Sequence, residues 1–317
     1  MVSGVRAELL RRISQVEENV SLAQFNALSV GGTTDFFTIA HDAIELIEAV
    51  KGAIDAKVPY VVVGAGEGVL FSDGGFPGLV IHNLSSNCVM TADHSQMIVD
   101  SGMQLQRFIT SAASQGFGGL TSLYGVGGTI GGALYTNAGA NGQNILSSVR
   151  YVTMLMPPTK MKVDVTMVRY KADWLTKDGG LTKLQQLRVD RSIDEPRPVI
   201  LNAHIQLTSV RSDELIRRIT EQVKGLARSV PKGEVFGPLF LPLPDQNLEE
   251  ILSASGIDKI RVDGLYVEKR NRNYLRKGKV QPSASSVWNM VTQIQQAAWH
   301  ATGAELRPAF ERIGLWE

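Results

Sequence analysis

The sequence predicts an α+β fold, because strand-forming and helix-forming segments follow one another in an irregular order. Short apolar runs rich in valine and isoleucine occupy much of the first two thirds of the chain, with helical periods between them. A more helical stretch spans about 211–303. This mixed order is typical of α+β proteins and not of a regular alternation of strands and helices. A length of 317 residues suits two or three domains.

The composition is that of a globular protein, with 44% hydrophobic and 20% charged residues. A net charge of +1 gives no general reason to expect binding to nucleic acid or to a membrane. The single cysteine, Cys88, excludes an internal disulfide framework, suits a cytoplasmic location, and is interpreted as a packed side chain and not as a reactive thiol. The N-terminus lacks the apolar stretch of a signal peptide, and no run of 18 apolar residues predicts a membrane span.

Two helices are expected in the N-terminal part. Residues 5–20 are predicted to be helical because apolar side chains recur on one face, at Val5, Leu9, Leu10, Ile13 and Val16. A second helix is predicted over 42–57, where Asp42 is suited to cap the first turn and Pro59 follows the end.

The remaining elements are predicted from short apolar runs, helical periods and breaker residues. Strands are expected at 60–63, 78–84, 97–103 and 199–208, with a hairpin over 149–169. Helices are expected at 104–116, 212–228, 245–255 and 284–302, and a short strand closes the chain within 304–317.

Two glycine-rich segments stand out, at Gly64–Gly68 directly after a strand and at Gly125–Gly142. Glycine lets a ligand approach the backbone closely, and successive backbone amides in such turns form anion-binding concavities. Two such loops suit a ligand with a pyrophosphate and a flat ring system, although glycines that merely form tight turns are the alternative. Neither segment has the spacing of a Rossmann fingerprint or of a P-loop.

Three runs of sequence resemble one enzyme family, the UDP-N-acetylenolpyruvoylglucosamine reductases: "SVGGTTDFF" (29–37), "VVVGAGEGVLFSDGGFPGLVI" (61–81) and "GLTSLYGVGGTIGGALYTNAGANG" (119–142). The later segments "VRYK", "KGEVFGP", "VEKRNRNYLRKG" and "ELRPAFERIG" follow in the order of the family. The resemblance therefore covers nearly the whole chain.

This resemblance implies a vanillyl-alcohol-oxidase-type FAD-binding fold of two subdomains, with a smaller α+β substrate-binding domain. The implied division is 1–84 for the first FAD-binding subdomain, 85–210 for the second and 211–303 for the substrate-binding domain, with the strand in 304–317 returning near the site. In this family NADPH reduces FAD, and the flavin passes a hydride to the enolpyruvyl group of a nucleotide sugar during peptidoglycan precursor synthesis.

The residues that the resemblance assigns to FAD lie in the two glycine-rich segments. The first set is Val63, Gly64, Ala65, Gly66, Glu67, Gly68 and Val69. The second set is Gly125, Val126, Gly127, Gly128, Thr129, Gly131, Gly132, Asn137 and Ala138. By the same resemblance, Tyr170, Arg270 and Asn271 are expected to contact the substrate.

The catalytic positions of the family carry other residues here. Glu234 stands where the family has its proton-donating serine, and Lys171 stands where it has an arginine. Ala309 replaces a glutamate, and Glu311, two residues later, is either a substitute for it or an ordinary surface charge. Lysine keeps the positive charge of arginine but loses the planar fork that holds a carboxylate with two hydrogen bonds. Glu234 would donate a proton only if its surroundings favoured the protonated acid.

These departures leave two other functions open: a flavin oxidoreductase of the same fold with a different substrate, and a non-catalytic FAD-binding or regulatory protein. The basic run 259–279 is consistent with contacts to phosphates of NADPH or of a nucleotide sugar, although the acidic residues mixed into it favour a solvated surface. The five histidines have no paired spacing, so no metal site is expected.

Overall fold

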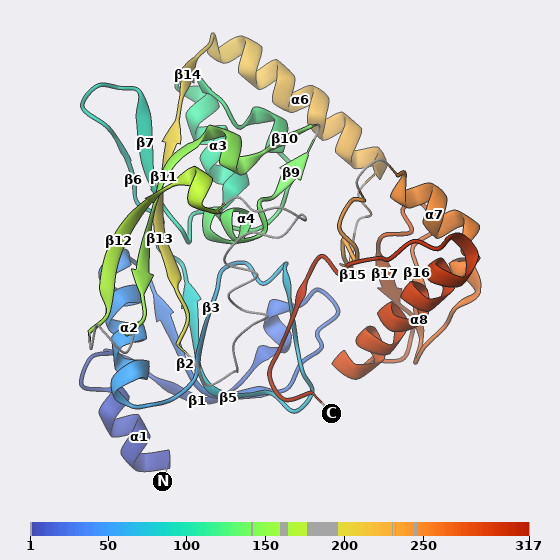
Figure 1. Cartoon of the computed structure of the whole chain (residues 1–317), viewed down its shortest axis with the longest axis horizontal. Helices are drawn as coiled ribbons and strands as arrows, with labels where there is room; N and C mark the ends of the chain where they lie inside the picture. The colour runs from blue at the N-terminus through green and yellow to red at the C-terminus, as the bar shows by residue number, and fades with distance from the viewer. Residues whose placement is uncertain are drawn as a thin grey trace. The chain divides into compact units, whose positions relative to one another are not determined.

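The computed structural model describes residues 2–140, 142–158, 164–175, 196–229, 231, 233–243 and 246–316. Its chain divides into two compact units (Figure 1). The first unit comprises Met1–Glu18, Asp35–Ala65 and Gly78–Lys224, and the second comprises Asn19–Thr34, Gly66–Pro77 and Gly225–Glu317. The division into three domains at residues 84, 210 and 303 stays a prediction.

A four-stranded sheet belongs largely to the first unit and has the strand order β1–β2–β5–β3. Its strands are β1 (Glu17–Ser21), β2 (Thr33–Ala40), β3 (Tyr60–Val63) and β5 (Phe76–Asn83). The helices α1 (Val2–Leu9) and α2 (Ala43–Asp55) share a core with this sheet. As predicted, Asp42 caps α2, because its carboxylate accepts hydrogen bonds from the backbone N–H groups of Ile44 and Glu45, both at 2.8 Å.

The predicted helix over 5–20 is wrong beyond its first turns. Helix α1 ends at Leu9, and the chain then turns and enters β1. The apolar period over 5–20 nevertheless identified core residues correctly, since Leu9, Ile13 and Val16 are all buried. Pairing of β1 with β2 satisfies the backbone of residues 17–21, so tertiary structure overrides the local helical period.

A five-stranded antiparallel sheet forms the second layer of the first unit, with the order β12–β11–β13–β7–β6. Its strands are β6 (Cys88–Met90), β7 (Gln96–Asp100), β11 (Val149–Met156), β12 (Thr166–Lys171) and β13 (Val199–Gln206). Strands β11 and β12 pair as the predicted hairpin, and part of its turn lies outside the described residues.

Two helices, α3 (Leu105–Ser114) and α4 (Ile130–Thr136), pack on one face of this sheet (Figure 1). Helix α3 buries Leu105, Phe108, Ile109 and Ala112, the i, i+3, i+4, i+7 pattern of an amphipathic helix. Short elements complete the unit, namely β8 (Phe117–Gly118), η2 (Thr121–Leu123), β9 (Gly139–Ala140), β10 (Gln143–Asn144), η3 (Ile145–Ser148), η4 (Ala172–Leu175) and β14 (Thr208–Ser209).

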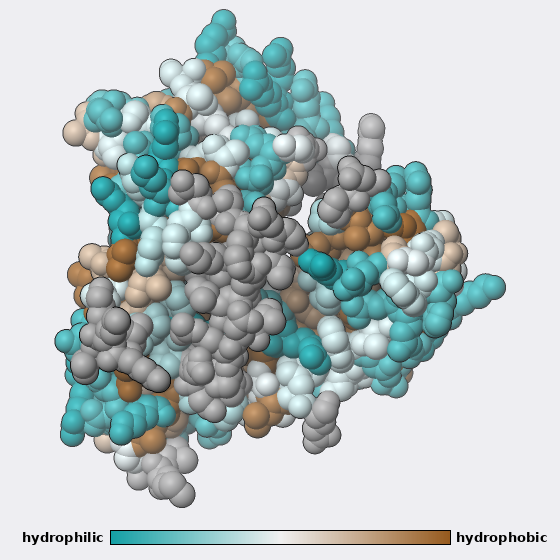
Figure 2. All heavy atoms as spheres, in the orientation of Figure 1, coloured by the Kyte–Doolittle hydropathy of each residue, from teal (hydrophilic) through white to brown (hydrophobic). Residues whose placement is uncertain are grey.

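Helix α6 (Ser212–Ser229) follows the last of these strands, and Figure 2 shows mostly hydrophilic residues along it. The inward side of the helix includes Leu215, which is buried, and Gln222, whose side chain donates to the Ser122 carbonyl at 2.5 Å. The predicted helix over 212–228 is therefore confirmed.

The second unit has a three-stranded sheet of order β15–β17–β16 covered by helices. Its elements are η1 (Leu22–Phe25), β4 (Val69–Phe71), β15 (Val235–Phe236), α7 (Leu248–Ala254), η5 (Ile257–Lys259), β16 (Leu265–Val267), β17 (Leu275–Lys277), α8 (Ala284–Thr302) and β18 (Glu311–Ile313). The predicted helices near 245–255 and at 284–302 are confirmed as α7 and α8. Among the helices of the described residues, none is long and apolar enough to cross a bilayer.

Candidate functional site

The first glycine-rich turn contacts the second within the first unit. Gly64 follows β3, and a Cβ atom at this position would lie 2.5 Å from Oγ1 and 2.7 Å from Cγ2 of Thr129. Real Cβ atoms do not approach other atoms so closely, so only glycine permits this contact. The fold thus brings together two segments that the sequence had assigned to one ligand.

The second segment offers backbone donors. Gly125 and Gly128 have φ angles of +97° and +88°, in the region that favours glycine. A Cβ atom at Gly128 would meet nothing within 4 Å. Within the described residues, the backbone N–H groups of Gly127 and Gly128 donate no hydrogen bond. Donors of this kind in a glycine-rich loop suit an anionic ligand.

The ends of α4 add further groups. Thr129 caps the N-terminus, where its Oγ1 accepts from the N–H of Gly132 at 3.3 Å. Asn137 follows the last turn in the left-handed conformation, with φ 48° and ψ 50°. Its Oδ1 atom is buried, and no described residue donates a hydrogen bond to it. A buried acceptor without a partner points to a ligand that donates a hydrogen bond there.

These features fit FAD. The free N–H groups of Gly127 and Gly128 suit a pyrophosphate. The orphaned Oδ1 of Asn137 suits an N–H or O–H group of the cofactor. Other predicted contacts, such as Val126 and Ala138, lie in the same stretch and stay predictions.

The rest of the first glycine-rich turn belongs to the second unit. Gly66 has a φ of +79°, and a Cβ there would lie 2.5 Å from the carbonyl oxygen of Phe25. The carbonyl of Gly68 accepts from the N–H of Glu311 at 3.0 Å, and Val69 pairs with Glu311 where β4 and β18 run in parallel. Glu311 therefore lies beside the end of this turn.

Ala309, at the family's glutamate position, lies two residues before Glu311. Its N–H donates to the Leu239 carbonyl at 2.8 Å, and a methyl side chain brings no chemical function. Glu311 is only partly buried, and its role as a substitute stays a prediction.

Tyr170 and Lys171 are neighbours on β12 and face opposite sides of the sheet. Tyr170 pairs with Val152, which is fully buried in the core beneath α3 and α4, whereas Lys171 pairs with Tyr151. The Tyr170 ring stacks on Trp174 with the ring centroids 4.1 Å apart. The side chain of Lys171 is exposed, and it forms no ion pair within the described residues.

Glu234 immediately precedes β15 in the second unit. Its carboxylate forms an ion pair with Lys277, with Oε2 and Nζ 3.3 Å apart, and the side chain of Glu234 is 67% exposed. The carboxylate at the family's serine position is therefore tied to a lysine of the second unit and open to solvent.

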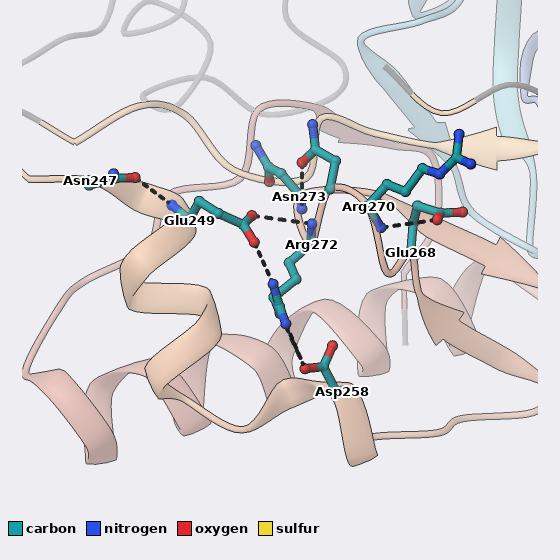
Figure 3. Close-up of polar contacts among 8 residues, drawn as sticks. Asn247, Glu249, Asp258, Glu268, Arg270, Arg272 and Asn273 are labelled. Carbon is teal, nitrogen blue, oxygen red and sulfur yellow. Dashed lines mark hydrogen bonds and ion pairs between the residues drawn. The ribbon is translucent and has the colours of Figure 1, made fainter. Parts of the chain in front are cut away.

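Part of the basic run is used inside the second unit (Figure 3). Arg272 binds Glu249 of α7 at 2.6 Å and Asp258 of η5 at 3.0 Å. The hydrogen bonds to Glu249 and then to Asp258 raise the pKa of the Arg272 guanidinium. Arg276 pairs with the buried Glu268, and this hydrogen bond lowers the pKa of the Glu268 carboxyl. Sequence reasoning considered phosphate contacts or a solvated surface and missed these internal ion pairs.

Two of the three predicted substrate residues, Arg270 and Asn271, lie in the loop that this network holds, whereas Tyr170 lies on β12 of the first unit. Asn271 accepts from the N–H of Asn273 at 3.0 Å, and Asn273 in turn accepts from the N–H of Phe240 at 2.8 Å. The backbone N–H of Arg270 donates to Glu268 at 3.2 Å. Figure 3 shows the Arg270 side chain directed away from the Arg272 network, and it is exposed. Arg270 is thus available to a ligand in a way that Arg272 is not.

Comparisons with known proteins agree with this geometry. Residues 34–162 match the family model of an FAD binding domain. The UDP-N-acetylenolpyruvoylglucosamine reductase of Geotalea uraniireducens is 28% identical, with 99% of this chain and 100% of that protein aligned. The enzyme of the same name from Geobacter metallireducens is 27% identical, over 99% of this chain and 98% of that protein.

A solved structure shows the same fold. The crystal structure of UDP-N-acetylenolpyruvylglucosamine reductase from Thermus caldophilus superposes with a TM-score of 0.75 at 22% identity, covering 94% of this chain and 99% of that one. The predicted α+β architecture with a vanillyl-alcohol-oxidase-type FAD-binding fold is therefore confirmed. The resemblance to the UDP-N-acetylenolpyruvoylglucosamine reductases is therefore confirmed over nearly the whole chain, and residues 34–162 match an FAD-binding domain.

Proposed function

We propose that this flavoprotein uses NADPH to reduce the enolpyruvyl group of UDP-N-acetylglucosamine enolpyruvate, a step in the synthesis of peptidoglycan precursors. The observation that carries the proposal is the contact of Gly64 with Thr129, which brings together, in the first unit, the two glycine-rich segments to which we assign FAD. The relatives that bear the name of this reaction align over almost their whole length, which supports the same substrate class.

FAD, when bound, would supply the hydride chemistry. The chain's own residues would bind and orient the cofactor. The N–H groups of Gly127 and Gly128 would hold its pyrophosphate, and Asn137 would accept a hydrogen bond from it. For the substrate we propose Lys171 as the cation for the carboxylate, with Tyr170, Arg270 and Asn271 as further contacts. Glu311 is the proposed negative group in place of Ala309.

The proton that completes the reduction needs a donor near the reacting carbon. Glu234 occupies the family's serine position, and its exposed side chain forms an ion pair with Lys277. We therefore propose that a water molecule held by Glu234 delivers the proton. Glu234→Gln would keep a polar group for that water, whereas Glu234→Leu would remove it, so a loss of rate confined to the leucine variant would support this assignment.

An anaerobic two-step experiment tests the proposed reaction. The purified yellow protein is reduced with NADPH, UDP-N-acetylglucosamine enolpyruvate is added, and the oxidised flavin band is followed over time. Prompt return of the band is the expected result. A protein that NADPH reduces but the enolpyruvyl substrate does not reoxidise would contradict the proposed substrate.

The second candidate is a flavin oxidoreductase of the same fold with a different substrate. The ion pair of Glu234 with Lys277 favours it, because a carboxylate tied to a lysine stands where the family has a serine for proton donation. The triple variant Glu234→Ser, Lys171→Arg, Ala309→Glu separates the two candidates. A gain of reductase activity would support the first candidate, and no gain would mean that the substrate pocket itself differs.

A further inference from the structure

The carboxyl end of β5 lies beside the first glycine-rich turn. Strands β3 and β5 are parallel, and Val63 at the end of β3 is opposite His82 on β5. The imidazole of His82 donates a hydrogen bond to the backbone carbonyl of Gly64. The ring is half-buried and lies against Phe37, with the ring centroids 6.3 Å apart. His82 therefore contacts the turn at the residue that touches Thr129.

Asn83, the next residue of β5, contacts Ser101, which in turn holds the second glycine-rich segment. Asn83 is 3% exposed, and its Nδ2 donates to Oγ of Ser101 at 2.8 Å. The carbonyl of Ser101 accepts from the N–H of Gly131 at 2.7 Å, in the first turn of α4. A Cβ atom at Gly131 would lie 3.0 Å from the Cβ of Ser101, so the two backbones are in close contact.

We infer that His82 and Asn83 are positioning residues for the cofactor, which together set the spacing between the Gly64 turn and the Gly128–Gly132 segment. Neighbouring residues of a strand point to opposite sides, so one strand end holds two separate loops. This inference rests on the proposed placement of FAD on these segments. It does not depend on which substrate the reduced flavin meets.

The physical argument is one of preorganisation. Glycine-rich turns have little intrinsic preference for one conformation. If they were not held in place, binding a ligand between two of them would order both turns, and the lost conformational entropy would weaken binding. Burial is the main cause that lowers the pKa of His82, and it keeps the imidazole neutral with an N–H available for Gly64. The Asn83 amide is equally fixed, because its Oδ1 accepts from the N–H of Ser85 at 3.1 Å.

The test uses the FAD-bound full chain and follows release of FAD after dilution by flavin fluorescence. His82→Phe keeps a planar ring but removes the donor, and we expect FAD to bind about five- to tenfold more weakly, the usual effect of one lost hydrogen bond. His82→Gln keeps a donor and should restore most of the affinity. His300→Phe is the matched control, because the exposed His300 lies on α8 in the second unit and is not among the groups that act on His82.

Ser101→Ala tests the role of Asn83, because it removes the hydroxyl to which the Asn83 amide donates and adds no volume. Weaker FAD binding in this variant, with Ser114→Ala on the exposed side of α3 unchanged, would support the inference. Wild-type FAD release in both His82→Phe and Ser101→Ala would overturn it, and so would an equal loss in His82→Phe and His82→Gln. An inactive protein that still shows these differences in FAD release would refute only the proposed reaction.

Discussion

The contact between Gly64 and Thr129 makes a quantitative prediction about a single methyl group. In Gly64→Ala the new Cβ would be placed 2.5 Å from Thr129 Oγ1 and 2.7 Å from Cγ2. Thr129 cannot move freely, because its hydroxyl caps α4 by accepting from the N–H of Gly132. Overpacking of this kind costs about 1–3 kcal/mol. We expect Gly64→Ala to lower the free energy of unfolding by about 2 kcal/mol and to weaken FAD retention.

A double variant isolates this clash. Thr129→Ala removes both atoms nearest the new methyl group and leaves Thr129 Cβ at 3.2 Å, at a cost of about 1 kcal/mol for the lost cap. If the clash is the cause, Gly64→Ala in the Thr129→Ala background should add almost nothing, which gives a coupling energy of about 2 kcal/mol.

Urea unfolding followed by circular dichroism measures these differences. Gly68→Ala is the matched control, because it lies in the same glycine-rich turn and a Cβ there would meet nothing within 4 Å. The reasoning is refuted if Gly64→Ala is no more destabilising than Gly68→Ala, or if the effects of Gly64→Ala and Thr129→Ala simply add.

Three further predictions concern the cofactor, the pH and the second unit. Gly128→Val should purify without flavin colour, because valine is strained at a φ of +88° and its side chain would cover the backbone donors; the flavin-to-protein absorbance ratio measures this, and a yellow variant would contradict the placement of FAD. Burial lowers the pKa of His82 and of His204 below the ordinary 6.5. Their contribution to stability is therefore present above pH 6.5 and is lost as the pH falls through their folded-state pKa values. Urea unfolding from pH 8 to 5 should show this loss of stability, and replacing both histidines by glutamine should reduce the loss. Arg272→Ala should lower the free energy of unfolding by about 1 kcal/mol, because its partners are partly exposed, whereas the exposed Arg270→Ala should change it little; equal melting temperatures would contradict the role of the ion-pair network.

Most secondary structure was predictable because it is encoded over short distances. The apolar faces of α3 and α8, the cap at Asp42 and the hairpin of β11 with β12 all follow from residues close together in the chain. The wrong prediction of a helix over residues 5–20 arose because strand pairing, and not the local sequence, decides the structure there. There the local period was helical, but pairing of β1 with β2 gave residues 17–21 a partner that the local pattern does not reveal.

The sequence by itself determined the α+β class, the two glycine-rich segments and the family, because motifs and periods are local properties of the chain. Only the tertiary structure decided that Gly64 touches Thr129 and that Glu234 is paired with Lys277. Each of these facts depends on segments far apart in the chain that are brought together by strand pairing and core packing. Their side chains meet through register and burial, which a linear pattern of residues does not specify.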